Sequence, residues 1–264
     1  MPHLDCHVSR NHTFIIVSAE DLGTESALND EIFALIQSKT VTSATVIANG
    51  PAFAQAAKAI AQFPGCSFGV HLNLTVFPPL WPSPHLKPIL DEDGALSPKL
   101  FTTHVTPQLQ RAVFDELTAQ VERALSAGIP VSHFDSHQHI HTLPKLFPVL
   151  KALQRRFSIR RVRSTINLLP PGQHLSPIRW FKKRLFCCAL HWHYRTASPE
   201  GLGEFRDFYA GLQVGQLPRF RELELMVHPG TTAPTYMHEI ALLRTDWRRL
   251  LPPGIAFGNY YSIS

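Results

Sequence analysis

Four histidines and one aspartate lie close together between His133 and His141, in the segment Val-Ser-His-Phe-Asp-Ser-His-Gln-His-Ile-His-Thr-Leu-Pro. On an extended backbone alternate side chains share one face, which here would hold Asp135, His137, His139 and His141. Neutral imidazole is the commonest nitrogen ligand of divalent transition metals, and a nearby carboxylate can orient the ring or supply an oxygen ligand. The segment therefore indicates a metal-centred site. A polar strand end with solvated histidines is the alternative.

Further polar side chains follow predicted apolar strands at equivalent places. These are Glu20, Asp21, His71, Arg163 and His228. In β/α barrels the carboxyl ends of parallel strands point to one face, so residues about 200 positions apart can meet in one pocket. We therefore expect these groups to converge on a single site.

Each of these residues also has an ordinary interpretation. Glu20 and Asp21 could cap a helix, because acidic side chains are favoured at helix N-termini. His71 could be a buried core histidine, and His228 could belong to a turn before Pro-Gly. Arg163 could be one of several surface arginines. Their joint placement at strand ends favours the functional interpretation.

Apolar runs alternate with segments of helical periodicity along most of the chain. Strands are predicted at 13–18, 43–48, 67–74, 131–135, 159–163, 222–227 and 254–260, and helices at 26–38, 52–62, 107–127, 144–157 and 239–251. This alternation predicts an α/β fold of parallel strands joined by right-handed crossovers, in a barrel or an open sheet. We predict one domain over residues 1–264, with irregular insertions near 77–98 and 164–222.

The chain is 44% hydrophobic and carries a formal charge of +5, which favours anionic neighbours such as nucleic acid, lipid head groups or acidic sugars. No basic run with interleaved aromatics resembles a nucleic-acid module, so no nucleic-acid partner is expected. Residues 178–192 mix aromatic and basic side chains and could lie on an anionic membrane surface. An ordinary barrel helix with solvated Lys and Arg is the favoured interpretation, and a homo-oligomer is left open.

The four cysteines, Cys6, Cys66, Cys187 and Cys188, match no zinc-ribbon or Cys-x-x-Cys spacing. Adjacent Cys187 and Cys188 would form only a strained disulfide, so a reduced, cytoplasmic setting is predicted. The N-terminal residues lack the apolar region of a secretory signal. No run approaches the ~18 apolar residues that span a bilayer.

Five segments, taken in order, resemble the sequence blocks of the YdjC-like carbohydrate deacetylases, a family that includes diacetylchitobiose deacetylases. They are 14–23 (FIIVSAEDLG), 41–51 (VTSATVIANGP), 69–75 (GVHLNLT), 133–144 (HFDSHQHIHTLP) and 224–230 (ELMVHPG). The resemblance implies a (β/α) barrel of the glycoside hydrolase/deacetylase type, in a distorted or seven-stranded form. It also implies a hydrolase that removes the N-acetyl group from an acetamido sugar and uses one divalent metal ion, Mg or Zn. The sugar is expected to be a mono- or oligosaccharide, and a lipid-linked sugar is an alternative substrate.

Carried over position by position, the resemblance implies that Asp21, His71 and His137 bind the metal. It places Glu20 where the family has its general base. It also aligns Arg163 with an arginine near that base, and His228 with the late His-Pro block.

From these roles we expect Glu20 to take the proton of the attacking water. His228, or a second histidine such as His139, would protonate the departing amine. Asp135 is expected to orient a ligand histidine rather than to bind the ion itself.

The acidic pair departs from the family pattern, which is usually Asp-Asp, because Glu20 takes the first place. Glutamate is one methylene longer, which can displace its carboxylate by ~1 Å, and misplacement of that order can cost ~100-fold in rate. Two alternatives to an active deacetylase follow. One is a catalytically impaired relative that binds sugar, and the other is a different single-metal amidohydrolase on the same scaffold.

Overall fold

The computed structural model describes residues 13–167, 169, 173, 175–230, 236 and 238–264. Residues 1–12, which include Cys6 and in which no secretory signal is predicted, lie outside the described residues. No helix within the described ranges combines the length and the apolar character needed to cross a bilayer.

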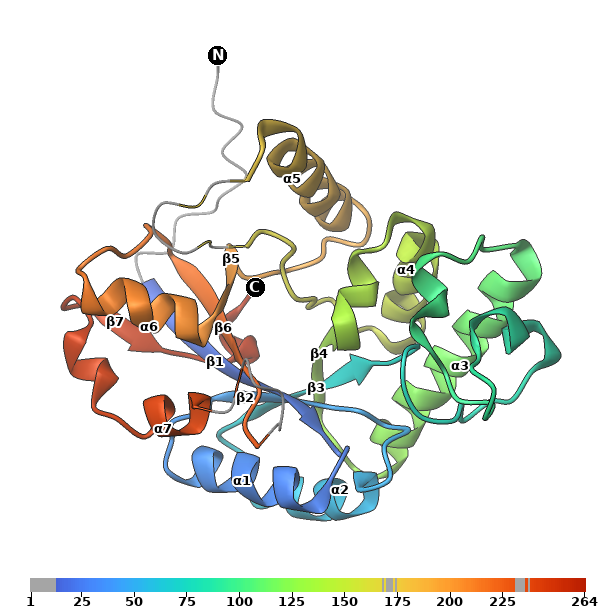
Figure 1. The fold of residues 1–264 in the computed structure, drawn as a ribbon, viewed down its shortest axis with the longest axis horizontal. Coiled ribbons are helices and arrows are strands. Elements are labelled where there is room, and N and C mark those ends of the chain that lie inside the picture. Colours follow the sequence, from blue (N-terminus) through green and yellow to red (C-terminus); the bar gives the residue numbers. More distant parts are fainter. Residues whose placement is uncertain (1–12, 168, 170–172, 174, 231–235, 237) are drawn as a thin grey trace.

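The described residues form a parallel seven-stranded sheet (Figure 1). Its strands are β1 (Thr13–Leu22), β2 (Ser43–Val46), β3 (Ser67–Leu72), β4 (Val131–Ser136), β5 (Gly201–Glu204), β6 (Glu222–Val227) and β7 (Ile255–Phe257). The strand order is β4-β3-β2-β1-β6-β5, and β7 pairs with the start of β1. β1 is central and almost wholly buried, as a continuous apolar run predicts for a parallel strand.

The segment 161–167 connects the two ends of this sheet. Val162 bridges Phe134 of β4, and Asn167 bridges Leu202 of β5, both in parallel. The predicted strand at 159–163 is therefore present only as isolated bridges. These bridges curl the sheet into a distorted barrel, in agreement with the fold class expected from the sequence.

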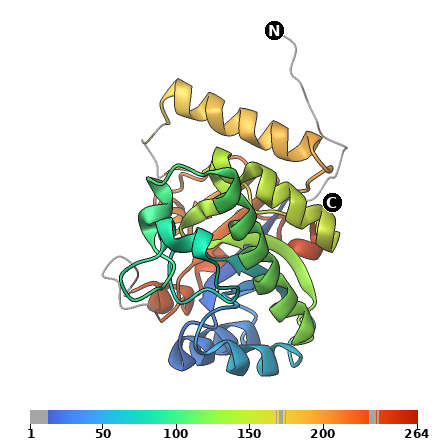
Figure 2. The ribbon, with the colours of Figure 1, turned by 90° about the vertical axis from the view of Figure 1, so that its right-hand side faces the viewer.

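Among the described residues, six α-helices lie around the sheet and a seventh stands apart from it (Figures 1 and 2). The six are α1 (Ser26–Gln37), α2 (Phe53–Ile60), α3 (Pro107–Ser126), α4 (Phe147–Phe157), α6 (Phe205–Gln213) and α7 (Glu239–Leu243), and the seventh is α5 (Pro177–Trp192). α1 buries Leu28, Ile32 and Leu35, the residues whose helical spacing predicted it. Thr106 caps α3 by accepting a hydrogen bond from the backbone N–H of Leu109.

The structure differs from the sequence-based elements mainly in the second half of the chain. The predicted helix 239–251 is divided into α7 and a 3-10 helix at Trp247–Leu250. Residues 164–222, where periodicity was weak, contain α5, β5 and α6. The proline-rich segment 77–98 contains a 3-10 helix at Pro84–Ile89 and a bridge between Leu90 and Leu96.

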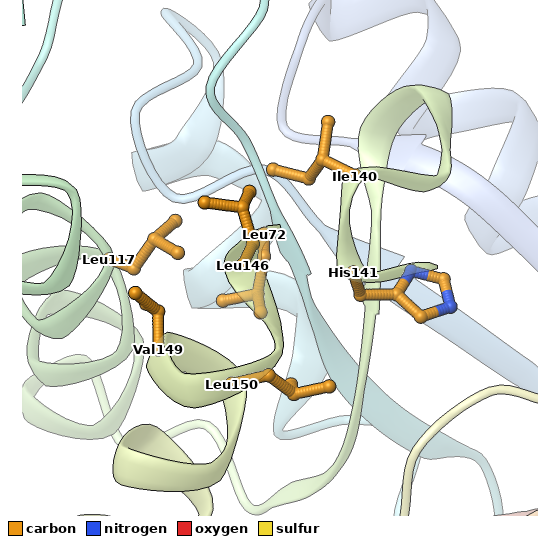
Figure 3. Close-up of a pocket in the computed structure, with 7 residues that line it drawn as sticks. All are labelled: Leu72, Leu117, Ile140, His141, Leu146, Val149 and Leu150. Carbon is orange, nitrogen blue, oxygen red and sulfur yellow. The ribbon is translucent and has the colours of Figure 1, made fainter. Parts of the chain in front are cut away.

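The histidine-rich segment is not extended, so the predicted alternation of side chains on one face is wrong there. β4 ends at Ser136, and a 3-10 turn with left-handed residues Gln138 and His139 follows it. The hydroxyl of Ser136 accepts a hydrogen bond from the backbone N–H of His141 at 2.9 Å, which turns the chain back. His141 therefore borders an apolar hollow lined by Leu72, Leu117, Ile140, Leu146, Val149 and Leu150 (Figure 3).

Gly69 of β3 permits a close contact inside the barrel. A Cβ at this position would lie 2.6 Å from the His133 ring, which stacks on Tyr260 with centroids 3.4 Å apart. Both rings are fully buried. The absence of a side chain at Gly69 is therefore required by packing.

We predict that Gly69→Ala lowers the free energy of unfolding by about 1–3 kcal/mol, because the added methyl overpacks a buried stack. Urea denaturation measures this change. Gly65→Ala is the matched control, since a Cβ there meets nothing within 4 Å. Equal midpoints for the two variants would contradict the packing argument.

Candidate metal centre

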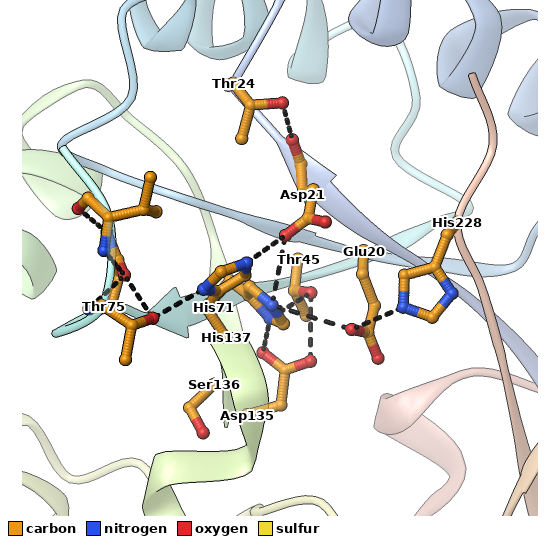
Figure 4. A network of polar contacts seen from close by, with 12 residues as sticks. Glu20, Asp21, Thr24, Thr45, His71, Thr75, Asp135, Ser136, His137 and His228 are labelled. Atoms are coloured by element: carbon orange, nitrogen blue, oxygen red, sulfur yellow. Dashed lines mark hydrogen bonds and ion pairs between the residues drawn. The ribbon is translucent and has the colours of Figure 1, made fainter. Parts of the chain in front are cut away.

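Glu20 and Asp21 lie at the carboxyl end of β1, where the strand is irregular. The pairing with β2 shifts register between Ala19 and Leu22, and Asp21 has a left-handed backbone with φ 64°. Successive side chains of a regular strand point to opposite faces. The irregularity instead brings both carboxylates to one side (Figure 4), within 3.7 Å (Glu20) and 3.4 Å (Asp21) of His71 Nε2.

His71 is fully buried on β3 and is oriented by Asp135 of β4. Its Nδ1 donates to Asp135 Oδ1 at 2.8 Å, and the Thr45 hydroxyl donates to the other oxygen at 3.0 Å. In the neutral ring this contact places the proton on Nδ1 and leaves the Nε2 lone pair facing Asp21. Burial alone would lower the pKa of His71, but the neighbouring carboxylates, first that of Asp135, outweigh it and raise the pKa.

His137 follows β4 directly and is oriented by Thr75. The Thr75 hydroxyl lies 2.7 Å from His137 Nδ1 and donates to Asn73 Oδ1 at 3.4 Å. Since its proton is engaged by Asn73, the Thr75 oxygen is free to accept from Nδ1–H. The Nε2 atom then faces Asp21 Oδ1 at 4.0 Å, and burial lowers the pKa of His137, which favours a neutral ring.

The donor atoms of Asp21, His71 and His137 fit a divalent metal in type, and two of them have no hydrogen-bond partner in the described part of the chain. Asp21 Oδ1 and His71 Nε2 are buried without a hydrogen-bond partner among the described residues. Metal bonds of about 2.0–2.1 Å bring tetrahedral ligands to roughly 3.4 Å from each other. The Asp21–His71 separation is already 3.4 Å.

The 4.0 Å separation between His137 Nε2 and Asp21 Oδ1 is wider than such a ligand set requires. Within the described ranges, no group of three or more His, Cys, Asp or Glu side chains is arranged to hold an ion.

Arg163 is fully buried and contacts three carboxylates from three strands. Its Nη1 donates to Glu20, its Nη2 lies 2.9 Å from Asp135 Oδ2, and its Nε and Nη2 donate to Glu224 Oε1 at 3.1 and 2.8 Å. The Tyr260 hydroxyl donates to the second oxygen of Glu224 at 2.6 Å. Arg163 is thus a fixed internal cation rather than a surface arginine.

His228 lies on the other side of Glu20, just after β6. Its Nε2 is 3.3 Å from Glu20 Oε2, and its ring stacks on Tyr236 with centroids 4.1 Å apart. Burial opposes the charged ring, but Glu20 outweighs it and raises the pKa of His228 to about 9. Burial would likewise raise the pKa of Glu20, but Arg163 and His228 hold that pKa well below its usual range.

The structure brings together all six residues selected from the sequence: Glu20, Asp21, His71, His137, Arg163 and His228. The remaining histidines of the 133–141 segment lie near the centre but make no described hydrogen bond or ion pair with these six residues. His133 stacks on Tyr260, His141 binds Ser136, and none of the described hydrogen bonds or ion pairs of the centre involves His139.

Sequence reasoning missed four residues that orient these groups: Thr45, Thr75, Glu224 and Tyr260. The one usable signal was Glu224, a charged residue in the middle of the apolar strand β6 and fully buried in the fold. Threonines in strands are common because β-branched residues favour them. Thr45 and Thr75 therefore carried no distinguishing mark.

Comparison with known proteins finds relatives of this chain. A family model described as "YdjC-like protein" matches residues 14–250. A carbohydrate deacetylase of Geobacillus stearothermophilus is 37% identical over 153 residues, which are 57% of this chain and 60% of that protein. One from Vibrio cholerae is 26% identical over 230 residues, 83% of this chain and 79% of its own length. The match therefore spans about 60% of the length of the Geobacillus relative.

A solved structure shares the fold over nearly the whole chain. It is an Enterococcus faecalis V583 protein named for cellobiose-phosphate cleavage, with a TM-score of 0.75 at 21% identity, covering 95% of this chain and 98% of the other. That likeness concerns the fold alone. Because the family model spans residues 14–250 of the 264, the chain belongs to the YdjC-like family.

Proposed function

We propose that this protein is a metal-dependent hydrolase that removes the acetyl group from an acetamido sugar and releases acetate. The proposal depends on one observation. Asp21 Oδ1 and His71 Nε2 are buried side by side, neither has a hydrogen-bond partner among the described residues, and the Glu20 carboxylate lies beside them. Curated relatives named carbohydrate deacetylase support the reaction class. The proposed substrates are mono- and oligosaccharides, including lipid-linked ones.

Asp21, His71 and His137 would hold one divalent ion, magnesium or zinc. Two histidines and one carboxylate leave further positions open for water and for a substrate oxygen. When bound, such an ion is a Lewis acid that lowers the pKa of a water and polarises the acetyl carbonyl. Asp135 and Thr75 hold the two histidine rings with Nε2 directed inward.

Glu20 is the proposed general base. One of its oxygens is bound by Arg163, and the other, Oε2, faces His71 and His228 at 3.7 and 3.3 Å. Because its pKa is held low, the carboxylate is ionised near neutral pH and able to accept a proton from the attacking water. Arg163 fixes the direction in which that proton is taken.

His228 is the proposed general acid. With a pKa raised to about 9, its ring is protonated near neutral pH and can donate to the nitrogen that leaves as an amine. Its backbone N–H donates to the Glu239 carboxylate, and its ring stacks on Tyr236. These contacts hold the ring beside Glu20.

The competing hypothesis is a relative that binds sugar or metal without turnover, and its motive is Glu20 in the place of the family aspartate. The contact between Glu20 and Arg163 supports an active deacetylase, because it fixes the longer side chain of Glu20 in one direction. A different single-metal amidohydrolase would use the same ligands on other amides.

We predict that metal-depleted protein binds about one zinc ion per chain and that His137→Ala loses this binding, because one of three protein ligands is gone. Thr75→Val should weaken zinc binding by about 10–100-fold, since it removes the partner of His137 Nδ1. Isothermal titration calorimetry measures both effects. His139→Asn is the matched control, because asparagine tolerates the left-handed backbone there and His139 is not a proposed ligand. Stoichiometric zinc in His137→Ala would refute the ligand set.

We predict that wild-type protein with zinc or magnesium releases acetate from N-acetylglucosamine or chitobiose derivatives. Glu20→Gln should keep the metal and lose at least about 100-fold in kcat, since an amide accepts no proton at this position. Glu20→Asp should lower kcat roughly 10–100-fold, because the shorter side chain cannot contact Arg163 and the attacking water at the same time. Metal-loaded wild type without turnover, together with an active Glu20→Asp, would establish the impaired relative instead.

We predict a pH-dependent contribution of the Glu20–His228 pair to stability. The folded pKa of His228 is raised from 6.5 to about 9, so its contribution is full below about pH 6.5 and is lost as pH rises through about 9. The difference in unfolding free energy between wild type and His228→Gln should therefore shrink by about 3 kcal/mol across this window. Denaturant unfolding in EDTA from pH 6 to 10 tests this, and a flat difference would contradict the pairing.

A further inference from the structure

Helix α5 is attached to the barrel by one face only. Of its sixteen residues only Leu190 is buried, and the Leu190 carbonyl accepts a hydrogen bond from Lys151 Nζ at 2.8 Å. Nearer the start of the helix, Lys183 Nζ donates to the Thr165 carbonyl at 2.8 Å. The favoured sequence interpretation, an ordinary barrel helix, does not describe this element, which projects from the fold in Figures 1 and 2.

The opposite face of α5 carries a stripe of exposed apolar side chains. The exposed fractions are 69% for Ile178, 62% for Phe181, 60% for Leu185 and 75% for Trp192, and the Cys188 thiol between them is exposed too. Their positions, i, i+3, i+7, i+10 and i+14, fall on one side of a helix. Five of the eleven exposed large hydrophobic residues of the described chain lie in this single helix.

Basic side chains border the stripe, and acidic ones are absent from its surroundings in the sequence. Lys182 and Arg184 are exposed next to the apolar positions, and Arg179 is exposed one turn earlier. Residues 136–199 contain no Asp or Glu at all. An exposed apolar stripe flanked only by cations is complementary to a surface that is apolar inside and anionic outside.

We propose that α5 binds the interface of an anionic lipid bilayer, with the Ile178–Trp192 stripe among the acyl chains and Lys182 and Arg184 at the lipid phosphates. A sixteen-residue helix is about 24 Å long, which suits a helix lying in the membrane plane. Aromatic residues such as Trp192 favour this depth because one part of the ring is apolar and another is polar. The proposal concerns a surface apart from the metal centre and does not depend on the reaction.

A second copy of the chain fits the same stripe less well. Pairing two α5 helices face to face would place Lys182 and Arg184 of one copy near the same cations of the other. Each copy also carries a formal charge of +5, and like charges oppose association. The lipid surface removes this repulsion, since its phosphates neutralise the flanking cations.

Co-sedimentation with vesicles tests the proposal. We expect the full chain to bind vesicles that contain phosphatidylglycerol and phosphatidylcholine, to bind pure phosphatidylcholine much less, and to bind less at high salt. The pair Lys182→Gln and Arg184→Gln should weaken binding by about 25-fold, at about 5-fold for each charge near the surface. The pair Phe181→Gln and Leu185→Gln should weaken it at least about 10-fold.

Matched controls use equally exposed residues elsewhere on the molecule. Arg111 and Arg249 have exposed fractions of 74% and 82%, and Val214 and Leu250 have 63% and 50%. Changing either control pair to Gln should leave vesicle binding within about twofold. All variants should keep the wild-type thermal midpoint, which separates folding from lipid binding.

Three outcomes would overturn the proposal. One is the absence of binding to anionic vesicles at low salt. Another is an equal loss of binding in the control variants, which would reduce the effect to overall positive charge. The third is a wild-type dimer in sedimentation velocity that Phe181→Gln with Leu185→Gln converts to a monomer while vesicles are not bound, which would assign the stripe to a second copy.

Discussion

The pairing of one buried arginine with three carboxylates is the interaction on which the centre of this molecule depends. Arg163 joins Glu20 of β1, Asp135 of β4 and Glu224 of β6, and it belongs to the 161–167 segment that bridges β4 and β5. Removing one partner from such a buried group costs about 3–5 kcal/mol, because the remaining charge is left without water or partner. Closure of the barrel and orientation of Glu20 are therefore consequences of the same contact.

Carboxylates outnumber the single guanidinium in and around this cluster. The Asp21 side chain adds a fourth carboxylate beside those of Glu20, Asp135 and Glu224, against one guanidinium. In the protein alone, this excess of negative charge raises the pKa of His71 and of His228 and so favours their protonated, positively charged rings. A divalent ion would meet it in another way, and it would also occupy the two buried atoms that lack partners. The excess of carboxylates is thus compatible with the proposed ligands Asp21, His71 and His137.

The sequence could predict the convergence of Glu20, Asp21, His71 and His228, because parallel apolar strands bring their carboxyl ends to one face. It could not predict the turn after β4, in which Gln138 and His139 are left-handed and the Ser136 hydroxyl accepts from the backbone N–H of His141. The contacts of Thr75 and Tyr260 were hidden because they join residues far apart in sequence. An exposed surface segment at residues 178–192 was only the less favoured alternative, because an apolar stripe in a sequence normally indicates burial.

The length of Glu20 is best understood from its two contacts together. One oxygen binds Arg163, whose position is set by Glu224 and in turn by the Tyr260 hydroxyl. The other oxygen faces His71 and His228. An aspartate on the same backbone would reach about 1 Å less far and would have to give up one of these contacts, unless the arginine moved with it. Since Arg163 is fixed by two further carboxylates, the extra methylene of Glu20 matches the arginine position of this chain.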